Sequence, residues 1–288
     1  MKIKLRWIVF AGWLLLNLNA FSQDTNFWVF VCFGQSNMEG FPGIQQQDKT
    51  NVDERFQVLA TVDFPKLGRT KGHWYPAVPP LCRPSTGLCP ADYFGRTMIA
   101  NLPKNIRVGV VNVAVAGCKI EMFQEDHYRS YASNAPVWMK GIIRAYNGNP
   151  YEYLVDMARQ AQKDGVIKGI LLHQGESNTG DQEWPNKVKD IYDSLIKDLN
   201  LNSKDVPLLA GEVVNADQKG MCAAMNKIID QLPKTIPAAH VISSAGCTAI
   251  TNGTLPNLHF TPAGYRELGR RYAETMLSLL GYPTAKTE

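Results

Sequence analysis

The feature that most constrains this chain is the segment 27–40, where an unbroken apolar run ends in a glycine and polar side chains. Residues 27–33 read Phe-Trp-Val-Phe-Val-Cys-Phe. Such a run of aromatic and β-branched types is typical of a strand buried on both faces. Gly34 allows a sharp turn into a helix, so Ser36 is expected at the strand's carboxyl end, where ligands bind in open α/β sheets. The alternative is that Gly-Gln-Ser-Asn forms only a turn.

Strand-like and helix-like segments alternate along the rest of the chain. The sequence predicts further strands at 56–62, 106–113, 167–173 and 206–212. It predicts helices at 91–101, 151–163, 182–198, 219–231 and 262–280, a long irregular segment at 66–90 and an insertion at 121–148. This alternation favours a three-layer α/β/α sandwich with a mainly parallel five-stranded sheet, formed by one domain over 23–288.

The first 22 residues have the order of a secretory signal peptide. A basic start, Met1 to Arg6, precedes an apolar core from Trp7 to Leu18, and cleavage is expected after Ser22. That core of about 12 residues is shorter than the roughly 20 of a membrane-spanning helix, which disfavours the alternative of a permanent anchor. The mature protein is therefore expected to be secreted or periplasmic, without membrane attachment.

The charge of the chain disfavours a polyanionic partner. The formal net charge is +4, and removal of Lys2, Lys4 and Arg6 with the signal would leave +1. Nucleic-acid binders need clustered positive charge, so no nucleic-acid partner is expected.

The chain has six cysteines, which can pair in an exported protein. Cys82 and Cys89 flank a short loop and are the first choice for a disulfide, with Cys222 and Cys247 as a second. The cysteine spacings match no zinc pattern, and neither a metal nor another cofactor is expected.

Two further segments add candidate catalytic residues to Ser36 of the segment 27–40. Residues 170–178 read Ile-Leu-Leu-His-Gln-Gly-Glu-Ser-Asn, and residues 256–262 read Pro-Asn-Leu-His-Phe-Thr-Pro. Together with Gly-Gln-Ser-Asn-Met, these blocks resemble the SGNH-type hydrolases, and within them the sialate O-acetylesterase and acetylxylan esterase group, carbohydrate esterase family six. The resemblance runs from about Trp28 to Leu280 and implies the flavodoxin-like fold of those hydrolases.

The resemblance assigns a nucleophile and a base. A serine hydroxyl needs a neighbouring base to attack an acyl carbon, and the family's catalytic histidine falls on His259, which would serve Ser36. Many SGNH hydrolases carry an aspartate three residues before this histidine, where this chain has Pro256. The resemblance therefore implies Glu176 as the acid that orients the imidazole. The alternative for Glu176 is a carboxylate that caps backbone donors.

Donors are needed for the oxyanion that forms during acyl transfer. We assign this role to the backbone N–H groups of Ser36 and Gly117 and to the side-chain amide of Gln174. Gly117 matches the glycine of the family's second sequence block. The candidate substrate-binding residues are Asn37, His173, Trp74 and Trp184, and Trp138 is another aromatic residue expected near the mouth of the site.

The resemblance implies a secreted carbohydrate O-acetylesterase that works through an acetyl-enzyme. Acetylated xylan and O-acetylated sialic acid are both candidate substrates. A non-catalytic glycan-binding protein on an esterase scaffold, motivated by Pro256, and a carbohydrate O-acetyltransferase stay open as alternatives. An ordinary lipase is disfavoured, because Met38 stands where the motif Gly-x-Ser-x-Gly requires a glycine.

Overall fold

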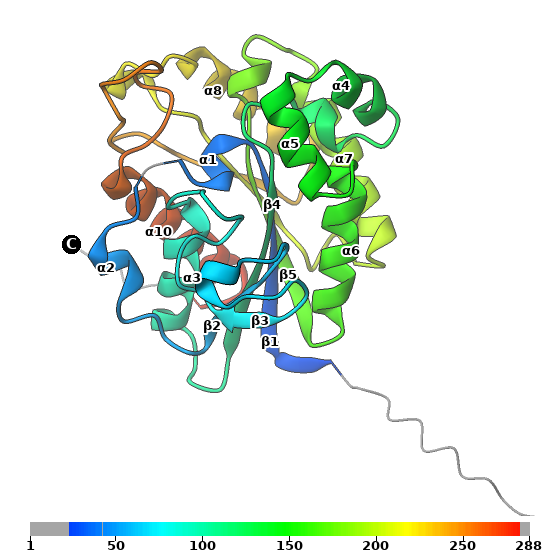
Figure 1. Cartoon of the computed structure of the whole chain (residues 1–288), viewed down its shortest axis with the longest axis vertical. Coiled ribbons are helices and arrows are strands. Elements are labelled where there is room, and N and C mark those ends of the chain that lie inside the picture. Colours follow the sequence, from blue (N-terminus) through cyan, green and yellow to red (C-terminus); the bar gives the residue numbers. More distant parts are fainter. Residues whose placement is uncertain (1–22, 42, 283–288) are drawn as a thin grey trace, which may run out of the picture.

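The computed structural model describes residues 23–41 and 43–282, and in this part a seven-stranded sheet lies between two layers of helices (Figure 1). The predicted signal peptide lies outside these residues. The strands are β1 Asp24–Gly34, β2 Phe56–Leu59, β3 Trp74–Pro76, β4 Arg107–Ala114, β5 Gly165–His173, β6 Leu208–Gly211 and β7 Ala239–Ile242. The helices are α1 Ser36–Glu39, α2 Gln46–Lys49, α3 Pro90–Asn101, α4 Tyr128–Asn134, α5 Val137–Ala145, α6 Pro150–Gln162, α7 Trp184–Asp198, α8 Asn226–Ile229, α9 Leu232–Thr235 and α10 Pro262–Leu279.

The strand order places β1 at the topological switch point of the sheet, where the order of strands reverses. The order is β3-β2-β4-β1-β5-β6-β7, and all neighbours are parallel except β2 and β3. After β1 the chain adds strands on one side and then, from β5, on the other. Loops that leave β1, β4 and β5 therefore diverge at the carboxyl edge and leave room for a site.

The α/β/α sandwich and the five predicted strands are confirmed. Two edge strands, β3 and β7, extend the predicted sheet from five strands to seven. β3 has three residues within the proline-containing segment predicted as irregular, and β7 has four. Strands this short carry too little alternation to be recognised in the sequence.

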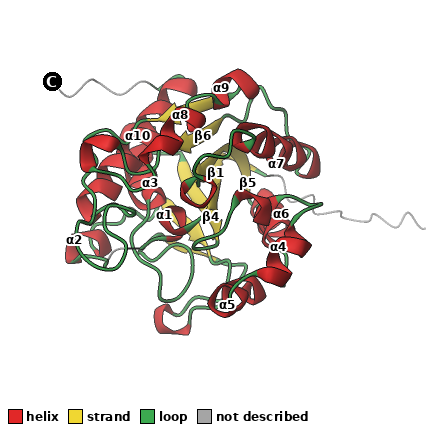
Figure 2. Cartoon of the chain, turned by 90° about the horizontal axis from the view of Figure 1, so that it is seen from above, coloured by secondary structure: helices red, strands yellow, loops and turns green. Residues whose placement is uncertain are grey.

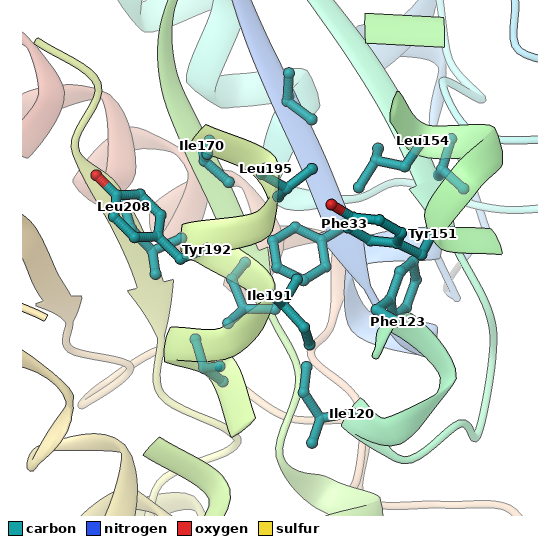
Figure 3. Packing of buried hydrophobic residues seen from close by; sticks show 14 of the residues in the cluster. Phe33, Ile120, Phe123, Tyr151, Leu154, Ile170, Ile191, Tyr192, Leu195 and Leu208 are labelled. Carbon is teal, nitrogen blue, oxygen red and sulfur yellow. The ribbon is translucent and has the colours of Figure 1, made fainter. Parts of the chain in front are cut away.

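β1 is buried on both faces from Phe27 onward, as its composition predicts. Its side chains alternate between two apolar clusters, because successive residues of a strand point to opposite faces. One cluster, with α6 and α7, contains Val29, Val31 and Phe33; the other, with α3 and α10, contains Trp28, Phe30 and Cys32. Figure 3 shows the first cluster, in which Phe33 meets Phe123 edge-on with 5.3 Å between ring centroids.

Four of the five predicted helices are present, as α3, α6, α7 and α10. The fifth, predicted at 219–231, is replaced by a 3₁₀ turn at Ala223–Met225 followed by α8 and α9. Lys219, where the predicted helix begins, has a φ of 54°, in the left-handed region, so right-handed helical turns start only after it. The insertion at 121–148 folds into α4 and α5, which the sequence did not predict. No described helix is long and apolar enough to cross a membrane.

Both predicted disulfides are wrong, since all six cysteines, which lie in the described part of the chain, have free thiols. Each thiol of the first pair has its own buried environment. Cys82 Sγ lies 3.3 Å from the hydroxyl of Tyr146, whereas Cys89 Sγ accepts from the side-chain amide of Asn112 at 3.7 Å. Cys222 Sγ of the second pair points to the carbonyl of Glu176, at 3.6 Å.

Candidate active site

Ser36 lies just beyond β1 as the first residue of α1, at the carboxyl edge of the sheet, which Figure 2 shows from above. Gly34 makes this turn possible. Its φ is 148°, and a Cβ there would lie 2.1 Å from the carbonyl oxygen of His173 in β5. Only glycine allows the two strand ends to approach so closely. The Gln35 N–H then donates to that carbonyl at 3.1 Å and fixes the turn.

Ser36 meets His259, although 223 positions separate them in the chain. The Ser36 Oγ and His259 Nε2 atoms are 2.9 Å apart. His259 is placed by the start of α10, where the Thr261 side chain accepts from Gly264 N at 3.1 Å and caps the helix. Ser36 is 7% exposed and His259 is 3% exposed. The structure therefore brings the two expected residues within hydrogen-bond distance.

Burial of the imidazole lowers the pKa of His259 to about 4. One residue that covers it is Phe41, whose ring stacks on the imidazole with 3.7 Å between centroids and 11° between planes. Phe41 is itself 54% exposed. The imidazole is thus neutral near pH 7, which is the form that can accept a proton from a hydroxyl.

Two backbone N–H groups close to Ser36 are free to bind a ligand. Over the described ranges, neither the Ser36 N–H nor the Gly117 N–H has an acceptor. Gly117 lies in the turn after β4, with a φ of 67°. The indole of Trp138, from α5, covers it, and its Cη2 lies 2.8 Å from where a Cβ on Gly117 would be. Trp138 is 56% exposed, so it also faces solvent beside the site.

The structure places Glu176 differently from the expectation of a triad. In the described part of the molecule, no hydrogen bond or ion pair joins Glu176 to His259. The Glu176 Oε1 atom instead accepts from the side-chain amide of Asn37, which also donates to the carbonyl of Leu258 at 3.2 Å. Glu176 thus reaches the histidine loop through Asn37. Burial raises the pKa of the Glu176 carboxyl to about 7.

Asn37 is also not available to a substrate. It is fully buried, and its Oδ1 accepts from the hydroxyl of Tyr265 in α10. With both ends of the amide in use, its role is to join α1, the loop after β5 and the start of α10.

Gln174 does not have a free donor for an oxyanion. Its Nε2 donates to Gln35 Oε1 at 3.0 Å, to Asn178 Oδ1 at 2.8 Å and to a backbone carbonyl at 3.2 Å. An amide nitrogen carries two hydrogens, so these acceptors use both. Its Oε1 accepts from the indole N–H of Trp184 at 2.5 Å. Trp184 is therefore a fully buried structural residue and does not lie at the mouth of the site.

The two other expected substrate-binding residues also have structural positions. His173 is fully buried, and its Nε2 lies 3.0 Å from the carbonyl of Glu212. Trp74 packs against Phe27 near the amino ends of the strands, and its indole donates to Asp164 at 3.0 Å. Trp74 thus lies at the opposite end of the sheet from Ser36.

Sequence reasoning missed two residues of this site. Phe41 covers His259, and Glu39 contacts the turn that contains Gly117, through Ala116 N at 3.3 Å. The available signal was their position directly after the Gly-Gln-Ser-Asn-Met block.

A mainly parallel sheet with a serine just after its central strand, paired with a histidine just ahead of the last helix, fits the SGNH-type hydrolase class. Within that class, a family model described as carbohydrate esterase, sialic acid-specific acetylesterase, matches residues 26–278. The chain belongs to this family of carbohydrate esterases.

The chain is also similar to individual proteins. A probable carbohydrate esterase of Arabidopsis thaliana is 22% identical over 264 residues, which cover 87% of this chain and 90% of that protein. The structure of NanS matches with a TM-score of 0.66 at 17% identity, over 90% of this chain and 99% of NanS. A carbohydrate acetylesterase from Xanthomonas citri matches with a TM-score of 0.59 at 18% identity, over 89% of this chain and 57% of that one. Structures at this identity show a shared fold.

Proposed function

We propose that this protein is a serine carbohydrate O-acetylesterase that removes acetyl groups from an acetylated glycan. The observation that carries the proposal is the 2.9 Å contact between Ser36 Oγ and His259 Nε2, beside two unoccupied N–H donors. A neutral imidazole next to a serine hydroxyl is the arrangement that activates serine as a nucleophile.

In the first half-reaction, Ser36 Oγ attacks the acetyl carbon and its proton passes to His259 Nε2. The N–H groups of Ser36 and Gly117 stabilise the negative oxygen of the tetrahedral intermediate. The bond from the acetyl carbon to the sugar oxygen then breaks, and His259 returns the proton to that oxygen. The sugar leaves as an alcohol, and the acetyl group stays on Ser36.

In the second half-reaction, water replaces the sugar. His259 takes a proton from the water as the water oxygen attacks the acetyl carbon. The bond to Ser36 Oγ breaks, Oγ recovers a proton from His259, and acetic acid leaves and releases its proton to solvent to give acetate. A carbohydrate O-acetyltransferase would differ only here, because a sugar hydroxyl would take the place of water.

The surroundings of the pair support a sugar ester as substrate. Phe41 and Trp138 are exposed aromatic residues at the site, the first stacked on the His259 imidazole and the second over Gly117. Aromatic faces pack well against the apolar faces of sugar rings. O-acetylated sialic acid and acetylated xylan are the substrates to test first. Secretion after signal cleavage is part of the same proposal.

The test is acetate release from acetylated xylan, O-acetylated sialic acid and a small aryl acetate, measured side by side for wild type and Ser36→Ala. We expect wild type to release acetate from at least one glycan and Ser36→Ala to lose this activity with an almost unchanged melting temperature. Glycan binding without acetate release by wild type would support the non-catalytic alternative, and acetyl transfer to a sugar in place of acetate release would support a transferase.

A further inference from the structure

Glu39 is a buried carboxylate that the proposed chemistry does not use. It ends α1, three residues after Ser36, and is 8% exposed. Its Oε1 atom forms an ion pair with Arg83 and accepts from the backbone N–H of Ala116 at 3.3 Å. Ala116 immediately precedes Gly117. Glu39 therefore links the helix that carries the nucleophile to the turn that carries the second free N–H.

Hydrogen bonds to the residues before and after Gly117, and to its carbonyl, fix this turn. The N–H of Gly117 itself takes part in none of them. Before it, Val115 N donates to the Gly34 carbonyl at 3.0 Å, and Ala116 N donates to Glu39. After it, Cys118 N donates to the Val115 carbonyl at 3.2 Å. The Gly117 carbonyl accepts from the hydroxyl of Ser177 at 3.0 Å. The Glu39 contact is the only one in this set that a side-chain carboxylate makes.

A buried ion pair is a poor source of stability, since desolvation of both charges opposes their attraction. Burial raises the pKa of the Glu39 carboxyl, and Arg83 acts against this rise. Arg83 also leaves its Nε buried without a partner. An apolar pair of similar volume would often fill such a space at no greater cost, so stability alone does not account for this ion pair.

We propose that Glu39 is a positioning residue: it holds the N–H of the Val115–Ala116 peptide, and so fixes the backbone from which the next peptide, Ala116–Gly117, directs the Gly117 N–H at the oxyanion. Arg83 in turn holds Glu39 in place and charged. This inference rests on the proposed acyl transfer at Ser36. A donor for the oxyanion acts mainly in the transition state, so its misplacement lowers kcat and leaves KM almost unchanged.

The test compares Glu39→Ala and Glu39→Gln with wild type on the best acetyl ester. Loss of one oxyanion donor typically costs about 10²- to 10³-fold in kcat, and we expect Glu39→Ala to lose roughly 10- to 100-fold, because the donor is misplaced but present. Glu39→Gln keeps an oxygen that can accept from Ala116 N, and should recover most of kcat. KM should change little in both variants.

Two further variants separate positioning from stability. Asp48→Asn breaks a comparably buried ion pair, between Asp48 Oδ1 and Arg266 Nε at 2.9 Å, and should lower the melting temperature without lowering kcat. The double variant Glu39→Leu/Arg83→Met removes both charges, so that no buried ion is left unpaired, and should fold with the low kcat of Glu39→Ala.

A kcat within about twofold of wild type in the folded double variant would overturn the positioning role. So would a Glu39→Gln variant as slow as Glu39→Ala. Failure of the proposed function itself would appear elsewhere, as a wild-type protein without Ser36-dependent acetate release.

Discussion

At the scale of single residues, the site differs from a complete serine triad in what lies behind the imidazole. The single hydrogen bond of His259 to another described side chain is the one with Ser36. The nearby acid, Glu176, acts on the loop through the Asn37 amide and the Leu258 carbonyl. Such an arrangement fixes the position of the histidine without placing a negative charge on its second ring nitrogen.

This geometry predicts a mild phenotype for Glu176→Gln. The glutamine keeps an oxygen that accepts from Asn37 Nδ2, so the loop should stay in place and kcat should fall by less than about 10-fold, whereas loss of a triad carboxylate costs about 10⁴-fold. The measurement is kcat for acetate release at pH 8. Glu176→Ala, which also loses the contact with Asn37, serves as the comparison and should be slower. A loss near 10⁴-fold in the glutamine variant would restore Glu176 to a direct role.

A second residue-scale prediction concerns the cover on His259. Because burial lowers the pKa of His259 to about 4, kcat/KM should fall only as the pH drops toward 4. Phe41→Ala lets water reach the imidazole and should move this acidic limb toward 6.5, the ordinary histidine value. At pH 5 the variant should then retain about one tenth of its value at pH 8, if its pKa reaches 6.

Phe41→Leu is the matched control, since a leucine keeps an apolar cover. Its acidic limb should stay close to that of wild type. An acidic limb near pH 6.5 in the wild-type profile would contradict the proposed effect of burial.

At the scale of elements, α5 brings an exposed aromatic residue to the site from outside the central sheet. It belongs to the insertion at 121–148 and places Trp138 over Gly117. If this indole packs against the sugar, Trp138→Ala should raise KM for an acetylated oligosaccharide by about 10-fold, equivalent to about 1.4 kcal/mol. KM for a small aryl acetate should change much less, because that substrate has no sugar ring.

Val137→Ala is the control for this prediction. Val137 precedes Trp138 on the same helix and is even more exposed, so a general disturbance of α5 would affect both variants. Equal changes for both substrates in Trp138→Ala would mean that the residue supports the turn and does not bind the sugar.

The elements also show what the sequence can and cannot predict. The central strands and α3, α6, α7 and α10 are long and strongly patterned, so their sequence predicts them. Ser36 and His259 could be paired because each belongs to a recognisable block. The partners of Gln174 could not be predicted, because they lie in three separate segments: Gln35 after β1, Cys118 after β4 and Trp184 at the start of α7. Amides and aromatic residues at a strand end look the same in sequence whether they face a ligand or each other.

At the scale of the whole molecule, two buried ionisable groups at the carboxyl end of β5, His173 and Glu176, link the stability of the fold to pH. Burial lowers the pKa of His173 to about 4 and raises that of Glu176 to about 7. His173 Nε2 contacts the Glu212 carbonyl, and so joins the end of β5 to the residue after β6. Protonation of His173 in the folded state would place a positive charge in this buried position. The folded state therefore disfavours the protonated imidazole.

The two groups predict opposite pH dependences of the free energy of unfolding. His173 has a lower pKa folded than unfolded, so its contribution is complete above about pH 6.5 and is lost as the pH falls toward 4. Glu176 has a higher pKa folded than unfolded, so its contribution is complete below about pH 4.5 and is lost as the pH rises through 7. Each contribution is at most about 3 kcal/mol.

Matched variants separate these contributions from those of titrating groups elsewhere in the molecule, while the two groups themselves face each other with 3.8 Å between His173 Nδ1 and Glu176 Oε1. His173→Asn and Glu176→Gln each replace an ionisable side chain with a neutral one, and urea unfolding at pH 4.5, 5.5, 6.5 and 7.5 gives each stability difference from wild type. The advantage of wild type over His173→Asn should shrink as the pH falls from 6.5, because wild type alone has to take up that proton on unfolding. Its advantage over Glu176→Gln should grow over the same interval. If the stability differences from His173→Asn and from Glu176→Gln changed with pH in the same direction, the assignment of a lowered pKa to His173 and a raised pKa to Glu176 would be contradicted.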